Sequence, residues 1–233
     1  MILYDYIETF QVNENLEYDL LEESWGNYIR VKNFWKYPEK ISEIVLNTPC
    51  IKLPSSIYNK HNGSKYFDGR SHLVFPTQML FSDVTKHLIS DNFKIDKQFL
   101  KVKWQSPTLL LNNVFKFLDE STYEKYKNCS YAPHKDGIDQ IACIWYMNKN
   151  YLEEDGTGIY DRTISDTEEC RFNLLESPWS SEPNRIGLIN AEYNSLVIYN
   201  GDIPHAQSLT KNWIDENRIT MVQFYHDTRV YKV

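Results

Sequence analysis

Two histidines and one aspartate in this sequence could together bind a metal ion. His134 and Asp136 stand two residues apart in the segment YAPHKD (131–136). Side chains at positions i and i+2 of a β-strand point to the same face, so both could bind one ion. The pair alone is a weak signal, because H-x-D arises readily by chance in a chain of 233 residues and the segment could equally be an ordinary loop.

His205 strengthens the metal-site interpretation. It follows the strand-like segment NSLVIYNGD (194–202) and is far enough from His134 in the sequence to lie on a separate strand. Two histidines and one carboxylate on one face of an octahedral ion form the ligand pattern of non-heme Fe(II) oxygenases, which leaves positions open for a cosubstrate and dioxygen. His134, Asp136 and His205 are therefore the candidate metal ligands.

Arg218 and Thr220 begin another strand-like segment, RITMVQFY (218–225). In a strand, Arg218, Thr220, Val222 and Phe224 would alternate onto one face. A buried guanidinium requires an anionic partner, and a carboxylate bound through two hydrogen bonds would satisfy it, with the Thr220 hydroxyl donating one more. The pattern predicts a dicarboxylate that binds both the metal ion and Arg218.

The elements that position these residues are mainly strands. Beyond residue 100, short aromatic and β-branched runs are separated by Asn, Asp, Gly and Pro, a pattern typical of strands. The runs are VKWQSPTLLLNNVFKFLD (102–119), IDQIACIWYMN (138–148), YNSLVIYNGD (193–202) and RITMVQFYH (218–226). No helical pattern clearly separates them in the last hundred residues, which favours an antiparallel sandwich or jelly roll over βαβ units. Upstream, the hydrophobic spacing predicts helices over 38–48 and 76–93, the second packing against a sheet.

The length and composition favour one folded domain. A chain of 233 residues with 42% hydrophobic and 15% aromatic residues can bury a substantial core. We expect a single domain over 1–233, in which mixed α/β elements of 1–100 pack on a β core of 101–233. The four cysteines are widely spaced, so we expect buried, reduced thiols and neither a zinc site nor a disulfide scaffold.

Charge and targeting signals exclude several classes of function. The formal net charge of −7 argues against a general nucleic-acid binder, which needs a surplus of basic residues facing phosphates. The N-terminal segment is acidic and does not resemble a secretory signal, and no apolar run approaches the roughly 20 residues that span a bilayer. We therefore expect a cytoplasmic protein without a membrane partner, whose oligomeric state the sequence does not indicate.

The ordered set of H-x-D, a distal His and R-x-T resembles the Fe(II)/2-oxoglutarate-dependent dioxygenase superfamily over roughly residues 100–230. Within it, YAPHKD (131–136) resembles the Tyr-x-Pro-His-x-Asp segment of prolyl-4-hydroxylase-type members. YMNKNYLEEDGTGIY (146–160) is similar to their strand, acidic loop and Gly-Thr-Gly turn, and NGDIPHA (200–206) to the turn that presents the distal histidine. The resemblance implies a double-stranded β-helix, which is a cupin-like jelly roll, with flanking helices.

The resemblance also implies roles for individual residues. His134, Asp136 and His205 would bind Fe(II), and Arg218 would bind the distal carboxylate of 2-oxoglutarate with help from Thr220. Tyr131 would line the cosubstrate pocket, although its offset from His134 could turn it to the other side of the sheet. The chain departs from prolyl hydroxylases in one respect, because these usually present a lysine where this sequence has an arginine.

The implied reaction couples the decarboxylation of 2-oxoglutarate by O₂, which yields succinate and CO₂, to hydroxylation of a second substrate. Asp136 favours hydroxylation, because halogenating relatives lack this carboxylate. The ligand set does not identify the substrate, for which a peptidyl residue or a small amino-acid-like metabolite is the expectation. The polar, glycine-bearing segments 61–72 and 153–172 are the candidate lid loops that would select it.

Two other classes of function remain open. The chain could be a non-catalytic β-sandwich binding or structural module that retains the fold, in which case the ligands would be vestigial. It could also be a cupin-like metalloenzyme that uses no 2-oxoglutarate, which would leave Arg218 unexplained.

Overall fold

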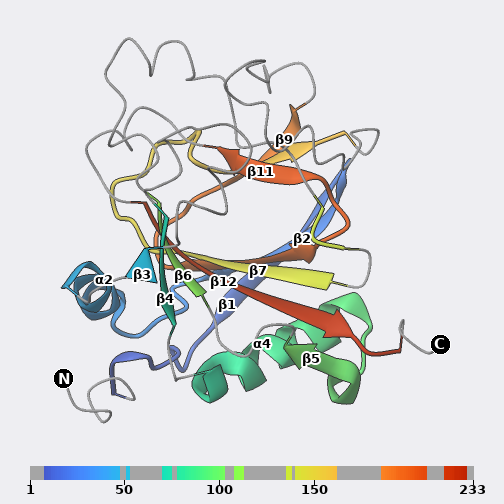
Figure 1. The fold of residues 1–233 in the computed structure, drawn as a ribbon. Helices are drawn as coiled ribbons and strands as arrows, with labels where there is room; N and C mark the ends of the chain where they lie inside the picture. Colours follow the sequence, from blue (N-terminus) through green and yellow to red (C-terminus); the bar gives the residue numbers. More distant parts are fainter. Residues whose placement is uncertain are drawn as a thin grey trace.

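The computed structural model describes residues 8–47, 51–52, 70–74, 78–102, 108–112, 135–137, 140–161, 185–208 and 218–229. The strands in these ranges form two antiparallel sheets that lie face to face, the smaller above the larger in Figure 1. This arrangement confirms the predicted fold, a mainly β jelly roll with flanking helices. None of the helices in these ranges is long and apolar enough to cross a membrane.

The larger sheet has nine strands, eight of them in the order β1-β2-β10-β7-β12-β6-β4-β3, with β5 also pairing with β12. Their bounds are β1 (Glu17–Glu23), β2 (Gly26–Lys32), β3 (Ile51–Lys52), β4 (Arg70–Val74), β5 (Leu100–Val102), β6 (Thr108–Asn112), β7 (Gln140–Tyr146), β10 (Ser195–Asn200) and β12 (Arg218–Asp227). The smaller sheet has the order β11-β8-β9, formed by β8 (Gly156–Tyr160), β9 (Arg185–Asn190) and β11 (His205–Ser208). Strands from the first hundred residues thus extend the sheet that the later strands build.

The helices lie on the outer side of the larger sheet. They are α2 (Pro38–Asn47), α4 (Gln78–Phe93) and the short 3₁₀ helix η2 (Lys97–Phe99). Figure 1 shows α4 below the larger sheet, on the face turned away from the smaller sheet. Ile41 of α2 and Ile89 of α4 are buried there with side chains of the central strands. The predicted helices over 38–48 and 76–93 are therefore confirmed, and the second packs against the sheet as expected.

The larger sheet separates two hydrophobic clusters. The outer cluster lies between this sheet and the helices and includes Phe10, Ile29, Phe34, Trp35, Ile89, Trp145, Met221 and Tyr225. The inner cluster lies between the two sheets and includes Trp25, Tyr28, Ala142, Tyr146, Ile159, Ile189, Val197, Tyr199 and Ile203. Because neighbouring side chains alternate along a strand, β7 and β12 contribute to both faces at once.

The Gly-Thr-Gly segment differs from the expectation, because it begins strand β8 and does not form a turn. Gly156 has a φ of +152°, and a Cβ built there would lie 2.0 Å from the carbonyl oxygen of Ile189. A glycine at this position therefore serves the close approach of β8 to β9. The predicted lid loop 153–172 is correspondingly wrong over 156–160, and the predicted lid loop 61–72 is wrong over 70–72, which belong to β4.

Candidate active site

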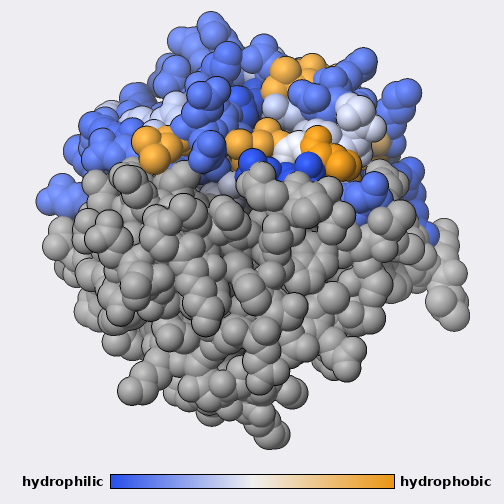
Figure 2. Space-filling model, turned by 90° about the horizontal axis from the view of Figure 1, so that it is seen from above, coloured by the Kyte–Doolittle hydropathy of each residue, from blue (hydrophilic) through white to orange (hydrophobic). Residues whose placement is uncertain are grey.

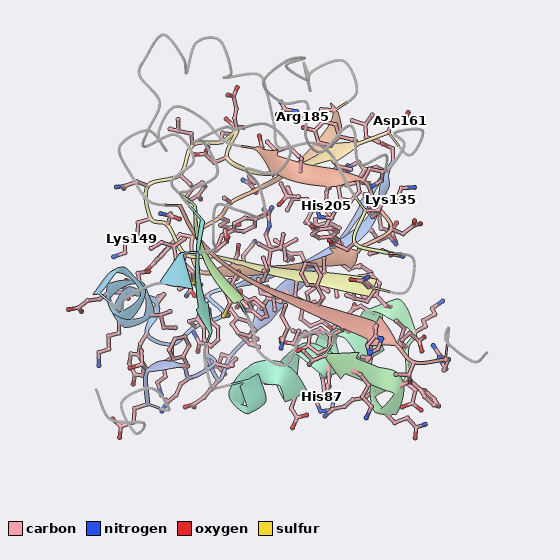
Figure 3. All side chains as sticks on the ribbon, viewed as in Figure 1. His87, Lys135, Lys149, Asp161, Arg185 and His205 are labelled. Carbon is pink, nitrogen blue, oxygen red and sulfur yellow. The ribbon has the colours of Figure 1, made fainter. Side chains whose placement is uncertain are left out.

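His205 is placed between the two sheets by its position in β11. It is the first residue of β11 and stands opposite Ile159 of β8, a member of the inner cluster. Paired residues of antiparallel strands share a face, so His205 also points towards the larger sheet. Its exposed fraction is 7%, and Figure 3 shows it between the two sheets.

Asp136 lies beside His205 and belongs to the segment that precedes β7. Its Oδ2 lies 3.4 Å from Nε2 of His205, and the exposed fractions of the two side chains are 11% and 8%. The backbone N–H of Asp136 donates to the carbonyl oxygen of Gly201 at 2.8 Å. Of the three predicted metal ligands, the structure therefore brings two together, a buried His205 and a partly buried Asp136.

A hydrogen bond defines the orientation of the His205 ring. Its Nδ1 lies 2.9 Å from the carbonyl oxygen of Ile203. A carbonyl oxygen only accepts, so Nδ1 carries the hydrogen, and in the neutral ring Nε2 then carries the lone pair on the side of Asp136. The ring of Tyr199 stands nearly perpendicular to that of His205, with the two centroids 5.1 Å apart.

The Asp136 and His205 donors suit a divalent transition metal. Imidazole nitrogen and carboxylate oxygen are ligands that Fe(II) accepts. Two such donors at about 2.1 Å from one ion are roughly 3.0 to 3.4 Å apart when they subtend angles of about 90 to 110°. The observed 3.4 Å lies at the upper end of this range. His134, the third predicted ligand, lies outside the described residues, and within them no group of three or more His, Cys, Asp and Glu side chains could hold a metal.

The predicted cosubstrate residues begin strand β12. Arg218 is its first residue and pairs with Asn112 of β6 in the backbone ladder. Thr220 is buried, with an exposed fraction of 2%, and stands opposite Tyr146 of β7. Because Tyr146 belongs to the inner cluster, Thr220 faces the space between the sheets, as the alternation predicted. Tyr131 lies outside the described residues.

A pair of buried hydroxyl groups, one of them opposite Thr220, was not predicted from the sequence. The hydroxyls of Tyr146 in β7 and Thr157 in β8 lie 2.6 Å apart and join the two sheets through a buried hydrogen bond. Alternation within IACIWY would have placed Tyr146 on the same face as Ala142 and Ile144. Its position opposite Thr220 depends on the register of β7 against β12, which the sequence does not encode in any local pattern.

Solvent reaches part of the inner face of the larger sheet. Ile144, Val222 and Phe224 are only partly buried, whereas their outer neighbours Trp145 and Met221 are fully buried. Figure 2 shows the molecule from the side of the smaller sheet, where the surface of the described residues is mostly hydrophilic with a few hydrophobic atoms along its border. The inner face of the larger sheet is therefore less completely buried than its outer face at these positions.

Comparisons with known proteins support the fold. No protein-family model and no curated protein sequence match the chain. Among solved structures, one that matches is HygX from Streptomyces hygroscopicus with nickel, 2-oxoglutarate and hygromycin B bound. The match covers 86% of this chain and 83% of the HygX chain, at 9% sequence identity and a TM-score of 0.51. At this identity the similarity shows a shared fold and does not by itself transfer a function.

Two further structures are more distant in shape. SnoN, a non-heme α-ketoglutarate-dependent epimerase from nogalamycin biosynthesis, covers 86% of this chain and 78% of its own, at 13% identity and a TM-score of 0.47. A prolyl-4-hydroxylase from Pseudomonas putida covers 68% of this chain and 92% of its own, at 11% identity and a TM-score of 0.25. The predicted resemblance to the prolyl-4-hydroxylase-type branch is therefore not specifically confirmed.

Proposed function

We propose that this chain is an Fe(II)- and 2-oxoglutarate-dependent dioxygenase that hydroxylates its substrate. The observation that carries the proposal is the pair of Asp136 and His205, both with little exposed side-chain surface, held 3.4 Å apart in a jelly roll. The HygX structure, which shares this fold, contains a metal ion and 2-oxoglutarate, and this supports the same pair of cofactors here.

Each residue of the proposed site has a distinct task. His134, Asp136 and His205 would bind the iron, and the carbonyl of Ile203 keeps the His205 ring in the orientation that directs Nε2 towards it. Iron held there would supply the redox chemistry that couples the decarboxylation of 2-oxoglutarate to transfer of one oxygen atom of O₂ to the substrate. The protein contributes orientation and partial exclusion of water.

The cosubstrate would lie along the inner face of β12. Arg218 would bind its distal carboxylate, and Thr220 would donate a further hydrogen bond. Tyr131 would line the same pocket. Tyr146 lies on the same inner face as Thr220, and its hydroxyl is hydrogen-bonded to that of Thr157 on the facing sheet, so these groups would form the polar wall against which a carboxylate binds.

The proposed substrate is a peptidyl residue or a small amino-acid-like metabolite. Its identity depends on residues around the metal and not on the ligands themselves. The HygX structure contains hygromycin B, which favours a screen of small molecules alongside peptides. In such a screen, succinate with a hydroxylated product supports hydroxylation, whereas succinate with a differently oxidised product indicates another reaction of the same cofactors.

Anaerobic titration with Fe(II) and 2-oxoglutarate tests the proposal without the substrate. Wild-type protein should develop the weak visible charge-transfer band of an iron-chelated 2-oxo acid, and His205→Ala should lose it. Arg218→Ala should retain metal binding but weaken 2-oxoglutarate binding about 10- to 100-fold, since a hydrogen-bonded ion pair contributes roughly 1.5 to 3 kcal/mol.

Arg229→Ala is the matched control for Arg218→Ala. Arg229 lies just beyond the other end of β12, where it forms an ion pair with Asp227. We expect Arg229→Ala to leave the affinity for 2-oxoglutarate unchanged. Equal affinity in Arg218→Ala and wild type would show that Arg218 is not the anchor. A folded wild-type protein that binds metal without developing the band would support the cupin-like alternative that uses no 2-oxoglutarate.

A further inference from the structure

We infer that Gly201 is a positioning residue that sets the distance between Asp136 and His205. The inference rests on the proposed function, because it concerns the same metal site. The segment NGDIPHA (200–206) resembles a turn that presents the distal histidine. We assign to the same turn the placement of Asp136 as well.

The turn between β10 and β11 contacts both proposed ligands through its backbone. The carbonyl oxygen of Gly201 accepts from the N–H of Asp136 at 2.8 Å. Two residues later, the carbonyl oxygen of Ile203 lies 2.9 Å from Nδ1 of His205. One short turn therefore holds two side chains that are distant in the sequence.

Hydrogen bonds inside and around the turn fix its shape. The N–H of Ile203 donates to the carbonyl oxygen of Asn200 at 3.0 Å, and the N–H of Asp202 donates to the side-chain oxygen of Asn200 at 3.0 Å. The second bond is an Asx turn, which stabilises a reversal of the chain locally. The N–H of Gly201 donates to the carbonyl oxygen of Gln140 at 2.8 Å, which joins the turn to the start of β7.

The absence of a side chain at Gly201 permits the close approach of Asp136. A Cβ built at Gly201 would lie 3.0 Å from Cβ of Asp136 and 3.0 Å from the carbonyl oxygen of Gln140. Both distances are shorter than most contacts that Cβ atoms make in proteins, so the neighbours would have to shift by a few tenths of an ångström. Because the carbonyl oxygen belongs to the backbone of β7, the Asp136 segment would yield more readily. Any side chain at 201 would therefore push Asp136 away from its observed position beside His205.

Gly201→Ala tests this role through metal binding alone. We would titrate wild-type protein and the variant with Co(II), without 2-oxoglutarate, and measure the dissociation constant and the visible d–d spectrum well below the unfolding temperature. We expect a 10- to 100-fold weaker dissociation constant and an altered spectrum, since changes in groups that orient metal ligands have effects of about this size. A purely structural role would lower the unfolding temperature and leave the affinity and spectrum of the folded protein unchanged.

Gly158→Ala is the matched control. It introduces a similarly close Cβ in β8, 3.1 Å from the hydroxyl oxygen of Tyr160, but this neighbour is the end of a side chain. We expect wild-type Co(II) affinity from this variant. If Gly201→Ala does not fold, Asn200→Ala replaces it, because loss of the Asx turn should weaken Co(II) binding in the same direction.

The outcomes separate the two proposals. If wild-type protein binds Co(II) and neither Gly201→Ala nor Asn200→Ala weakens or perturbs that binding, the positioning role is overturned and the proposed function stands. If wild-type protein binds no Co(II), both are overturned. Weaker binding in Gly201→Ala beside unchanged binding in Gly158→Ala supports the positioning role.

Discussion

The two faces of the larger sheet differ in chemistry although the same strands build them. On the outer face, Trp145 and Met221 are buried among aromatic and aliphatic side chains next to the helices. On the inner face, their immediate neighbours Tyr146 and Thr220 carry buried hydroxyls, and the Asp136–His205 pair lies across from the same sheet. At this point of the sheet the outer face is therefore apolar, whereas the inner face adds polar groups that can bind a ligand to its own apolar cluster.

The difference reflects the cost of burying polar groups. A buried hydroxyl or carboxylate loses hydration, which costs free energy unless a hydrogen bond replaces it. The inner face offsets part of that cost with the 2.6 Å bond between Tyr146 and Thr157. Such polar groups contribute less to folding than apolar groups of equal buried area.

The largest effect on stability is expected from Trp145→Ala. Trp145 is fully buried in β7 and makes an edge-to-face contact with Phe34, with ring centroids 5.6 Å apart. Removing a buried indole should lower the free energy of unfolding by about 3 to 5 kcal/mol, as large-to-small substitutions in cores do. Chemical denaturation followed by circular dichroism measures the change.

Val222→Ala is the comparison on the inner face. Val222 of β12 pairs with Ile144 of β7, the residue before Trp145, and is only partly buried. Val222→Ala should lower the free energy of unfolding by about 1 kcal/mol, because little apolar surface is removed. Equal losses in Trp145→Ala and Val222→Ala would contradict the division of roles between the two faces.

An intermediate effect is expected from the hydroxyl pair that joins the sheets. Tyr146→Phe and Thr157→Val remove one hydroxyl each with little change in shape, and each should lower the free energy of unfolding by about 1 to 2 kcal/mol. The double variant should lose less than the sum of the two, since the same hydrogen bond is removed only once. A coupling of about 1 kcal/mol in a double-mutant cycle would confirm this, whereas additive losses would show that the bond contributes nothing.

The sequence predicted these features unevenly. Strands β7, β10 and β12 follow from their aromatic and β-branched runs and helices α2 and α4 from hydrophobic spacing, and the buried thiol of Cys143 agrees with the expectation of reduced cysteines. Burial raises the pKa of that thiol well above its usual value, which keeps it protonated and unreactive.

Long-range pairing was not predictable from local pattern. The addition of β1 and β2 to the core sheet depends on β2 pairing with β10, which is far away in the sequence. The same holds for Tyr146, whose place opposite Thr220 depends on the register of two strands. Asp136 and His205 were predicted as ligands, but the turn carbonyl of Gly201 that holds Asp136 has no sequence signature beyond the glycine itself.

The smallest effect is expected from the ion pair at the far end of β12. The Arg229 guanidinium donates to Asp227 through its Nε at 2.9 Å and holds the pKa of that carboxyl below its usual value. A carboxyl with a lowered folded-state pKa stabilises the protein above its unfolded-state pKa, near 4, and this contribution is lost as the pH falls through the folded-state value. Asp227→Asn should therefore flatten the decline in the free energy of unfolding between about pH 5 and pH 2. The change should be smaller than the loss of stability in either hydroxyl variant, because the exposed Arg229 guanidinium is screened by solvent. Asp91→Asn, at an exposed position of α4, is the control and should leave that decline closer to wild type. If the free energy of unfolding fell with pH identically in Asp227→Asn and wild type, the ion pair at the end of β12 would make no contribution to stability.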